Sequence, residues 1–132
     1  MILVDTSVWV DYFHGKKAAH CTHLKAAIHN NEDLCVCGIV MTEILQGIRK
    51  DTDCKKVQQI LDDLLYLPAQ KSTYLSAAKM YRSLRKKGRT IRKPVDCIIA
   101  SICIENSSFL LHNDKDFEFI AEKFPLQRYK VQ

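Results

Sequence analysis

The chain opens with an uninterrupted apolar run that ends abruptly in polar side chains. Residues 1–4 (MILV) are followed at once by Asp5, Thr6 and Ser7. Because this run shows no polar alternation, it is typical of a parallel strand whose two faces are both covered by helices. Asp5 would then lie at the carboxyl edge of a sheet, where open α/β proteins bind their ligands. Asp5 or Thr6 could equally cap the following helix, so on these residues alone both interpretations stay open.

The rest of the chain alternates between helical and strand patterns. Apolar residues recur at helical spacing over residues 8–13, 18–30, 40–48, 52–65, 72–87 and 116–123, and another helix opens at Pro94. Short apolar runs predict further strands over residues 34–37, 66–68, 108–111 and 126–131. The alternation predicts a single α/β domain over residues 1–132, with a parallel sheet of four or five strands. In the helix over 72–87, we expect Leu75, Ala78 and Leu84 to face the core.

Length and composition fit one folded domain without a membrane span. The 132 residues are 47% apolar and include only four Gly and three Pro, which argues against disorder. No apolar run approaches the roughly 20 residues that a bilayer requires, and Asp5 interrupts what would be the apolar core of a signal peptide. We therefore expect a cytoplasmic protein that does not associate with membranes.

Neither the six cysteines nor the nearest histidine pair forms a recognisable metal motif. Cys35 and Cys37 are the closest cysteines, and two small buried thiols are the simplest interpretation of them. His20 and His23 are one helical turn apart but have no acidic company, so we interpret them as solvated helix surface.

Basic residues are concentrated in one stretch of the chain. Residues 71–95 hold nine of the 20 Lys and Arg side chains and none of the 15 Asp and Glu side chains. Basic side chains also favour helix C-termini, but nine uncompensated charges exceed what a helix dipole needs. The segregation therefore favours an anionic partner, and nucleic acid is the first candidate.

Four carboxylates stand at the ends or on the faces of predicted elements. Asp5 follows the first strand, Glu43 lies in a helix, Asp96 falls in a first helical turn, and Asp114 follows a late strand. Singly, each could be a cap, a dipole partner or an exposed charge. Together they would repel one another by about 4 kcal/mol per pair at a separation of about 4 Å. A divalent cation relieves this repulsion, and carboxylate oxygens suit Mg²⁺ and Mn²⁺.

These acids lie in motifs that resemble the PIN domain family, and more narrowly the VapC-type ribonuclease toxins. The motifs are Asp5-Thr6-Ser7, Glu43 followed by Gly47, Pro94-Val95-Asp96 before an Ile- and Ala-rich helix, and residues 110–117 (LLHNDKDF). They occur in the family's order and span nearly the whole chain. The resemblance implies a three-layer α/β/α sandwich around a parallel sheet of order 3-2-1-4-5.

The resemblance also implies roles for the acids. Asp5, Asp96 and Asp114 are expected to bind one or two Mg²⁺ or Mn²⁺ ions, and Glu43 is expected to bind metal or to orient the attacking water. Within the family these positions support hydrolysis of an RNA phosphodiester, so the resemblance implies the same reaction for this chain.

Several further residues are expected to support this site. Thr6 and Ser7 could hydrogen-bond a ligand carboxylate or a substrate phosphate, or could cap a helix. Asp116 is a weaker candidate than the other acids. The RNA backbone is expected to bind to the basic residues Arg82, Arg85, Lys86, Lys87, Arg89, Arg92 and Lys93.

Two features depart from the family pattern. His112 stands where the family usually has Thr or Ser, so a hydroxyl contact to the metal shell or the phosphate could be replaced by imidazole. Arg92 and Lys93 directly precede the Asp96 motif and could pair with that carboxylate.

The leading hypothesis is therefore a metal-dependent endoribonuclease, the toxin of a toxin–antitoxin pair. The resemblance further implies a homodimer and a VapB-like antitoxin whose carboxyl segment covers the acidic cleft. One alternative is a PIN-like module that binds RNA or protein with little or no cleavage. Another is an aspartate-nucleophile phosphohydrolase, but that chemistry normally wants a second Asp where this chain has Ser7.

Overall fold

The computed structural model describes residues 1–130, which form five strands and seven helices. In chain order the elements are β1 (Ile2–Val4), α1 (Thr6–Phe13), α2 (Ala19–His29), β2 (Leu34–Val36), α3 (Gly38–Gln46), α4 (Asp51–Asp62), β3 (Leu65–Tyr66), α5 (Lys71–Lys86), α6 (Val95–Glu105), β4 (Phe109–Leu111), α7 (Lys115–Lys123) and β5 (Gln127–Arg128). The predicted alternation of strands and helices is confirmed.

All five strands belong to one parallel sheet of order β3-β2-β1-β4-β5. The order that the family resemblance implies is therefore confirmed. Val4, the last residue of β1, is in register with Leu111, the last residue of β4. The backbone N–H of Asp5 then donates to the Leu111 carbonyl over 2.9 Å. The polar segments that follow these two strands consequently start side by side.

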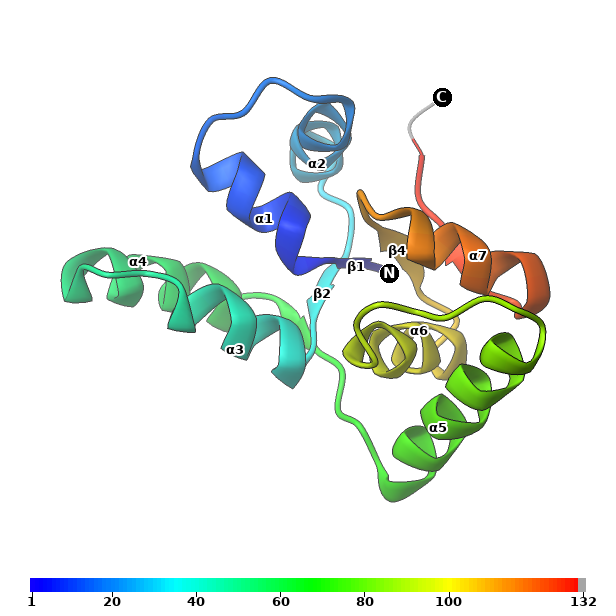
Figure 1. The fold of residues 1–132 in the computed structure, drawn as a ribbon. Coiled ribbons are helices and arrows are strands. Elements are labelled where there is room, and N and C mark those ends of the chain that lie inside the picture. Colours follow the sequence, from blue (N-terminus) through cyan, green and yellow to red (C-terminus); the bar gives the residue numbers. More distant parts are fainter. Residues whose placement is uncertain (131–132) are drawn as a thin grey trace.

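Helices cover both faces of the sheet, as the three-layer prediction requires. In Figure 1, α1 and α2 lie on one side of the central strands and α5 and α6 on the other. The three residues of β1 are at most 2% exposed, which explains their lack of polar alternation. Trp9 of α1 and Phe117 of α7 are among the largest fully buried side chains of the core.

The prediction for the buried face of α5 is wrong for two of its three residues. Leu75 is 55% exposed and Ala78 is also exposed, whereas Leu84 is buried. The stripe that faces the core consists of Thr73, Ala77, Met80 and Leu84. Thr73 can lie in this stripe because its hydroxyl donates to Glu105 Oε2 over 2.8 Å and accepts from the Gln70 backbone N–H over 3.0 Å.

The two edge strands are shorter or displaced relative to the prediction. β3 covers Leu65–Tyr66 instead of residues 66–68, and β5 covers Gln127–Arg128 instead of residues 126–131. Val131 lies outside the described residues. Both strands have only two residues, and all four are exposed, so the sequence shows no buried apolar run from which their bounds could be predicted.

Within residues 1–130, no helix combines the length and the apolar character needed to cross a bilayer. The cysteines are free thiols, and all except Cys54 are buried, as predicted for Cys35 and Cys37. Burial raises the pKa of both Cys35 and Cys37 and raises the pKa of Cys97 to about 11. Such thiols are poor nucleophiles and poor metal ligands near neutral pH.

Candidate active site

Asp5 occupies the N-cap position of α1, but its side chain does not cap the helix. Its carboxylate makes no hydrogen bond to the backbone of the first turn. Instead, Ser7 Oγ donates to Asp5 Oδ2 over 2.9 Å. The side chain is buried, with 3% of the residue exposed. The interpretation of the Asp5 side chain as a helix cap is therefore wrong, and its carboxylate lies at the carboxyl edge of the sheet, as predicted.

Glu43 joins this edge from α3 through a hydroxyl of α1. Thr6 Oγ1 donates to Glu43 Oε1 over 2.9 Å, and the Glu43 side chain is half-buried. Thr6 and Ser7 thus each hold one of the predicted acids. This fixes the orientation of two carboxylates that would otherwise be free to rotate.

Asp96, Asp114 and Asp116 form the tightest group of carboxylates in the described part of the chain. One carboxylate oxygen from each lies within 4.8 Å of the others. Asp96 comes from the first turn of α6, and Asp114 is the N-cap of α7. Asp114 Oδ1 also accepts the Asp116 backbone N–H over 2.9 Å, so it caps the helix as well. Asp116, ranked below the other acids from the sequence, is a full member of this group.

The environment of Asp96 is the least favourable for a free carboxylate. The residue is 1% exposed, and Asp96 Oδ2 is buried without a hydrogen-bond partner among the described residues. Burial raises the pKa of Asp96 to about 7. Lys93 opposes this rise, and the charges of Asp5, Asp114 and Asp116 reinforce it. Asp5 is therefore close enough to act on the three-acid group electrostatically.

These residues fit a divalent cation. Hard carboxylate oxygens converge from three side chains, and the unpartnered Asp96 Oδ2 lacks the donor that a buried carboxylate normally has. A cation such as Mg²⁺ or Mn²⁺ would supply the missing positive charge and take oxygen ligands of this kind. The donor set excludes the softer sites built from thiolates.

Arg92 reaches the same carboxylates. Its Nη2 donates to Asp114 Oδ1 over 3.0 Å, its Nε donates to Asp116 Oδ2 over 3.3 Å, and its backbone N–H donates to Asp116 Oδ2 over 3.1 Å. Lys93 Nζ lies 3.9 Å from Asp114 Oδ2. Arg92 and Lys93 were expected to pair with Asp96, but their direct contacts are to Asp114 and Asp116. Lys93 acts on Asp96 only through its charge, which lowers the pKa of that carboxyl group.

The remaining basic residues lead from α5 toward the acids. Arg82, Arg85 and Lys86 lie on the exposed side of α5, and Lys87 and Arg89 follow in the exposed loop before α6. Arg85 lies over the Tyr81 ring at 5.6 Å, and Arg89 lies over the Phe119 ring at 4.1 Å. The Phe119 contact holds the loop against α7 and so brings the basic segment beside the acidic site.

His112 organises the turn between β4 and α7. Its Nδ1 accepts the Asp114 backbone N–H over 3.1 Å, which leaves the proton of a neutral ring on Nε2. Nε2 lies 3.4 Å from Glu118 Oε2, which in turn accepts from Arg128. Burial lowers the pKa of His112, which favours the neutral ring. The imidazole therefore positions the Asp114 backbone by accepting its N–H.

The interpretation of His20 as solvated surface is wrong. His20 is buried, and its Nε2 lies 2.7 Å from Asp11 Oδ2, which also pairs with Lys16. The partner comes from α1, nine residues earlier in the sequence. Sequence spacing along α2 could not reveal it.

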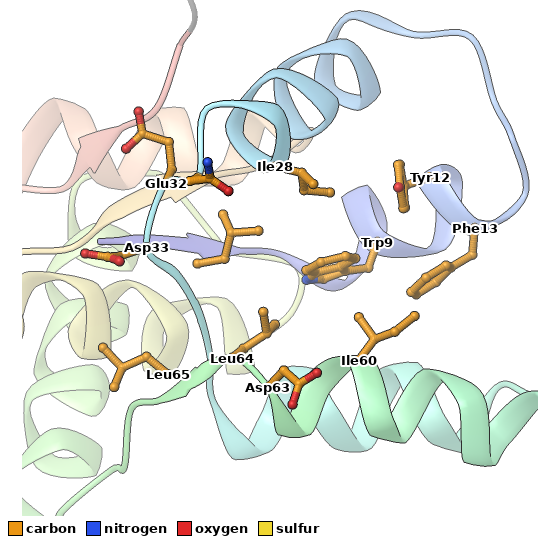
Figure 2. A pocket seen from close by; sticks show the side chains of 12 residues that line it. Trp9, Tyr12, Phe13, Ile28, Glu32, Asp33, Ile60, Asp63, Leu64 and Leu65 are labelled. Carbon is orange, nitrogen blue, oxygen red and sulfur yellow. The ribbon is translucent and has the colours of Figure 1, made fainter.

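An apolar groove runs beside α1 and was not identified from the sequence. Its first part, about 930 Å³, is lined by the aromatic side chains of Trp9, Tyr12 and Phe13, by Ile60 and Leu64, and by the acids Glu32, Asp33 and Asp63 (Figure 2). Trp9 Nε1 is buried without a hydrogen-bond partner among the described residues.

A second hollow of about 800 Å³ continues this groove toward the acids. It shares Phe13 and Ile60 with the first part and is bordered by Glu43. The groove therefore connects an apolar, aromatic surface to one of the candidate catalytic carboxylates.

Comparison with known proteins places this geometry in a family. The PIN domain family model matches residues 2–123. Ribonuclease VapC11 of Mycobacterium tuberculosis is 30% identical over 129 residues, covering 96% of both chains.

The fold is shared with solved toxin–antitoxin complexes. VapBC2 from Rickettsia felis, solved with a DNA fragment from the promoter, aligns with a TM-score of 0.76 at 20% identity over 100% of both chains. VapBC-1 from nontypeable Haemophilus influenzae aligns with a TM-score of 0.76 at 20% identity over 98% of both chains.

Proposed function

The chain belongs to the PIN domain family, and from this premise we propose that it is a metal-dependent endoribonuclease acting as the toxin of a toxin–antitoxin pair. The identity to a protein named as a VapC ribonuclease, over nearly the full length of both chains, supports the reaction class. The sequence-derived alternative of an aspartate-nucleophile phosphohydrolase has no such support, since Ser7 stands where that chemistry wants its second acid.

The observation that carries the proposal is the buried, unpartnered oxygen of Asp96 among converging carboxylates. A buried carboxylate without a donor or counter-ion is costly, and such groups are retained mainly where function requires them. One carboxylate oxygen each of Asp114 and Asp116 lies within 4.8 Å of an Asp96 carboxylate oxygen, and Asp5 adds negative charge beside them. This arrangement suits Mg²⁺ or Mn²⁺, one or two ions.

The residues of the site have distinct tasks in phosphodiester hydrolysis. A divalent cation bound by Asp5, Asp96, Asp114 and Asp116 would lower the pKa of the attacking water and stabilise charge on the phosphate. Ser7 fixes the Asp5 carboxylate, and Thr6 fixes Glu43 so that its free oxygen can accept a hydrogen bond from the attacking water. The water oxygen bonds to phosphorus, the bond to the leaving sugar oxygen breaks, and a proton ends on that oxygen.

The basic segment supplies the substrate contacts. Arg82, Arg85, Lys86, Lys87 and Arg89 are exposed, and the segment ends at Arg92 and Lys93 beside the acids. An RNA strand following these side chains would bring a phosphate to the carboxylates. Such contacts provide affinity that is largely independent of sequence and falls with salt.

We place the antitoxin in the groove beside α1. Its apolar, aromatic lining suits an amphipathic peptide segment, and its acids suit a peptide that carries Arg or Lys. Because the groove continues to Glu43, a basic side chain of the same peptide could reach the catalytic acids. A homodimer and a cytoplasmic location remain predictions from the family.

Cleavage of RNA by purified protein tests the reaction. We expect wild type to cleave single-stranded RNA in Mn²⁺ or Mg²⁺ but not in EDTA. Asp96→Asn and Asp5→Asn should lose at least about 100-fold in rate, since each removes a ligand charge where transition-state charge is stabilised. Asp62→Asn on the exposed end of α4 is the matched control and should cleave normally.

The opposite results are equally informative. Equal cleavage by wild type and both site variants would sink the mechanism, because it would trace the activity to a contaminant or to another site. Wild type that binds RNA in the presence of metal without cutting it would favour the binding module.

A further inference from the structure

Arg92 provides a positive charge from the chain itself at the acidic site. Its guanidinium bonds to Asp114 and Asp116, two of the three acids that converge on the candidate metal position. Asp116 is almost fully buried, with 3% of its side chain exposed, whereas 64% of the Arg92 side chain is exposed. The guanidinium is therefore largely exposed to solvent and can leave these acids without disturbing the core.

The guanidinium and a metal ion would draw on the same two carboxylates, those of Asp114 and Asp116. Asp114 Oδ1 accepts from both Arg92 Nη2 and the Asp116 backbone N–H. Asp116 Oδ2 accepts from Nε and from the backbone N–H of Arg92. A carboxylate oxygen has about two lone-pair positions, so these two atoms are already saturated. Asp96 Oδ2, in contrast, has no donor among the described residues.

We propose that Arg92 is an internal counter-ion that the divalent cation displaces, and that its freed guanidinium then binds a phosphate of the RNA. The inference rests on the proposed nuclease function and assigns Arg92 a positioning role in it. The Arg92 backbone N–H bonds to Asp116 independently of the side chain. The displaced guanidinium therefore stays at the rim of the site, where its planar fork matches a phosphate.

The neighbouring Lys93 does not provide the same device. Its Nζ lies 3.9 Å from a single oxygen, Asp114 Oδ2, and 52% of its side chain is exposed. An ammonium group is a point charge that does not span two carboxylates as a guanidinium does. Substitution of Lys93 therefore serves as a nearby control for the loss of positive charge.

Calorimetric titration with Mn²⁺ in the absence of RNA measures the competition. We expect Arg92→Gln to bind Mn²⁺ roughly three- to ten-fold more tightly than wild type, the range that follows from releasing one or two partly exposed ion pairs. Lys93→Gln should show a smaller gain. Arg82→Gln removes the same charge from the exposed side of α5 and should leave the Mn²⁺ affinity unchanged. Equal or weaker Mn²⁺ binding by Arg92→Gln would overturn the proposal.

Thermal unfolding separates a counter-ion from a merely structural contact. In EDTA, Arg92→Gln should melt at a lower temperature than wild type. Among residues 1–130, Arg92 pairs with both Asp114 and Asp116, and the only other cationic side chain that pairs with either is Lys93, at 3.9 Å from Asp114. Saturating Mn²⁺ should raise its melting temperature more than that of wild type and close most of the gap. A deficit that is the same in EDTA and in Mn²⁺ would mean a structural contact and would overturn the proposal.

RNA provides the final discrimination. With an RNA whose phosphorothioate linkages slow the attack of water on phosphorus, wild type should bind Mn²⁺ more tightly than it does alone, because the displaced guanidinium then donates to the phosphate. Arg92→Gln should lose most of this RNA-induced gain in Mn²⁺ affinity. Arg92→Lys keeps the positive charge and should retain part of the gain, which would show that the position tolerates substitution. Undiminished coupling in Arg92→Gln would overturn the phosphate role.

Failure of this inference and failure of the proposed function give different results. If wild type cleaves RNA and binds Mn²⁺ but Arg92→Gln binds Mn²⁺ no more tightly, only the proposed role of Arg92 is rejected. If wild type binds no Mn²⁺ and cleaves no RNA, the proposed nuclease function is rejected.

Discussion

At the scale of single residues, Asp96 carries a buried carboxylate whose ionisation lowers the stability of the metal-free fold. Below pH 3.8, the ordinary pKa of this side chain, the carboxyl group is neutral in both the folded and the unfolded chain. Between 3.8 and the folded-state pKa of about 7, the unfolded chain ionises and the folded chain does not. Stability is therefore lost as the pH rises through this window and stays low above it.

Asp96→Asn should consequently stabilise the metal-free protein at pH 8. Removing the buried charge is worth at most about 4 kcal/mol, from the difference between 3.8 and about 7. We expect the gain in the free energy of unfolding, measured by urea denaturation in EDTA, to vanish near pH 4. Mn²⁺ should stabilise wild type but not the variant. A variant less stable than wild type at pH 8 in EDTA would contradict the burial of an uncompensated charge.

Most of the candidate acids were predictable because each follows a local rule. Asp5 and Asp114 follow buried strands, and Asp96 lies in the first turn after a proline. Their roles depended on the family resemblance, since single positions do not distinguish a ligand from a cap. Asp116 ranked below the other acids in the sequence because its position in the first turn of α7 also fits an interaction with the helix dipole. The Asp-Lys-Asp spacing was the available signal, but only the fold brings both carboxylates to Asp96.

At the scale of elements, α5 illustrates where periodicity alone fails. The sequence offers two stripes, one through Leu75 and Ala78 and one through Thr73, Ala77 and Met80. The first stripe runs on into the basic Arg82, whereas the second reaches the apolar Leu84. Thr73 is the polar member of the second stripe, and its hydroxyl donates to Glu105 of α6, a partner 32 residues away. Periodicity along α5 does not reveal this partner, which allows a hydroxyl to be buried in the stripe that faces the core.

Substitutions on the two stripes of α5 test this orientation. Met80→Ala removes a buried side chain from the core and should cost about 2–4 kcal/mol of unfolding free energy. Leu75→Ala, on the exposed side, should change it by no more than about 0.5 kcal/mol in the isolated chain. Urea denaturation of both variants at low protein concentration provides the measurement. A larger loss of unfolding free energy in Leu75→Ala than in Met80→Ala would show that the stripe expected from the sequence faces the core.

At the scale of the whole molecule, three surfaces converge near the N-terminus of α1. The acidic site lies at the carboxyl ends of β1 and β4, the basic segment approaches it from α5, and the apolar groove approaches it along α1. The sheet order creates this convergence, because β1 and β4 are neighbours although more than 100 residues separate them. The groove was not predictable from the sequence, since Trp9 and Ile60 come from distant helices and each reads simply as core.

Ile60 lines both parts of the groove, so its substitution separates binding of the antitoxin from RNA cleavage by the toxin. Ile60 is 43% exposed and lies on α4. Ile60→Glu would bury a carboxylate against Phe13 when an apolar peptide occupies the groove. We expect it to weaken binding of a VapB-like antitoxin at least roughly ten-fold, because an unpaired buried charge is strongly unfavourable. RNA cleavage by the free toxin should stay close to that of wild type.

Gln58→Glu is the matched control for this substitution. It adds the same charge to an exposed position of α4 outside the groove residues and should leave both antitoxin affinity and cleavage unchanged. Affinity is measured by titrating the labelled antitoxin, and neutralisation by its effect on RNA cleavage. If Ile60→Glu is neutralised as well as wild type, the antitoxin does not use this groove. If both variants lose antitoxin binding equally, long-range charge is responsible, and contact in the groove is not. A loss confined to Ile60→Glu would show that the antitoxin holds the toxin through the apolar groove.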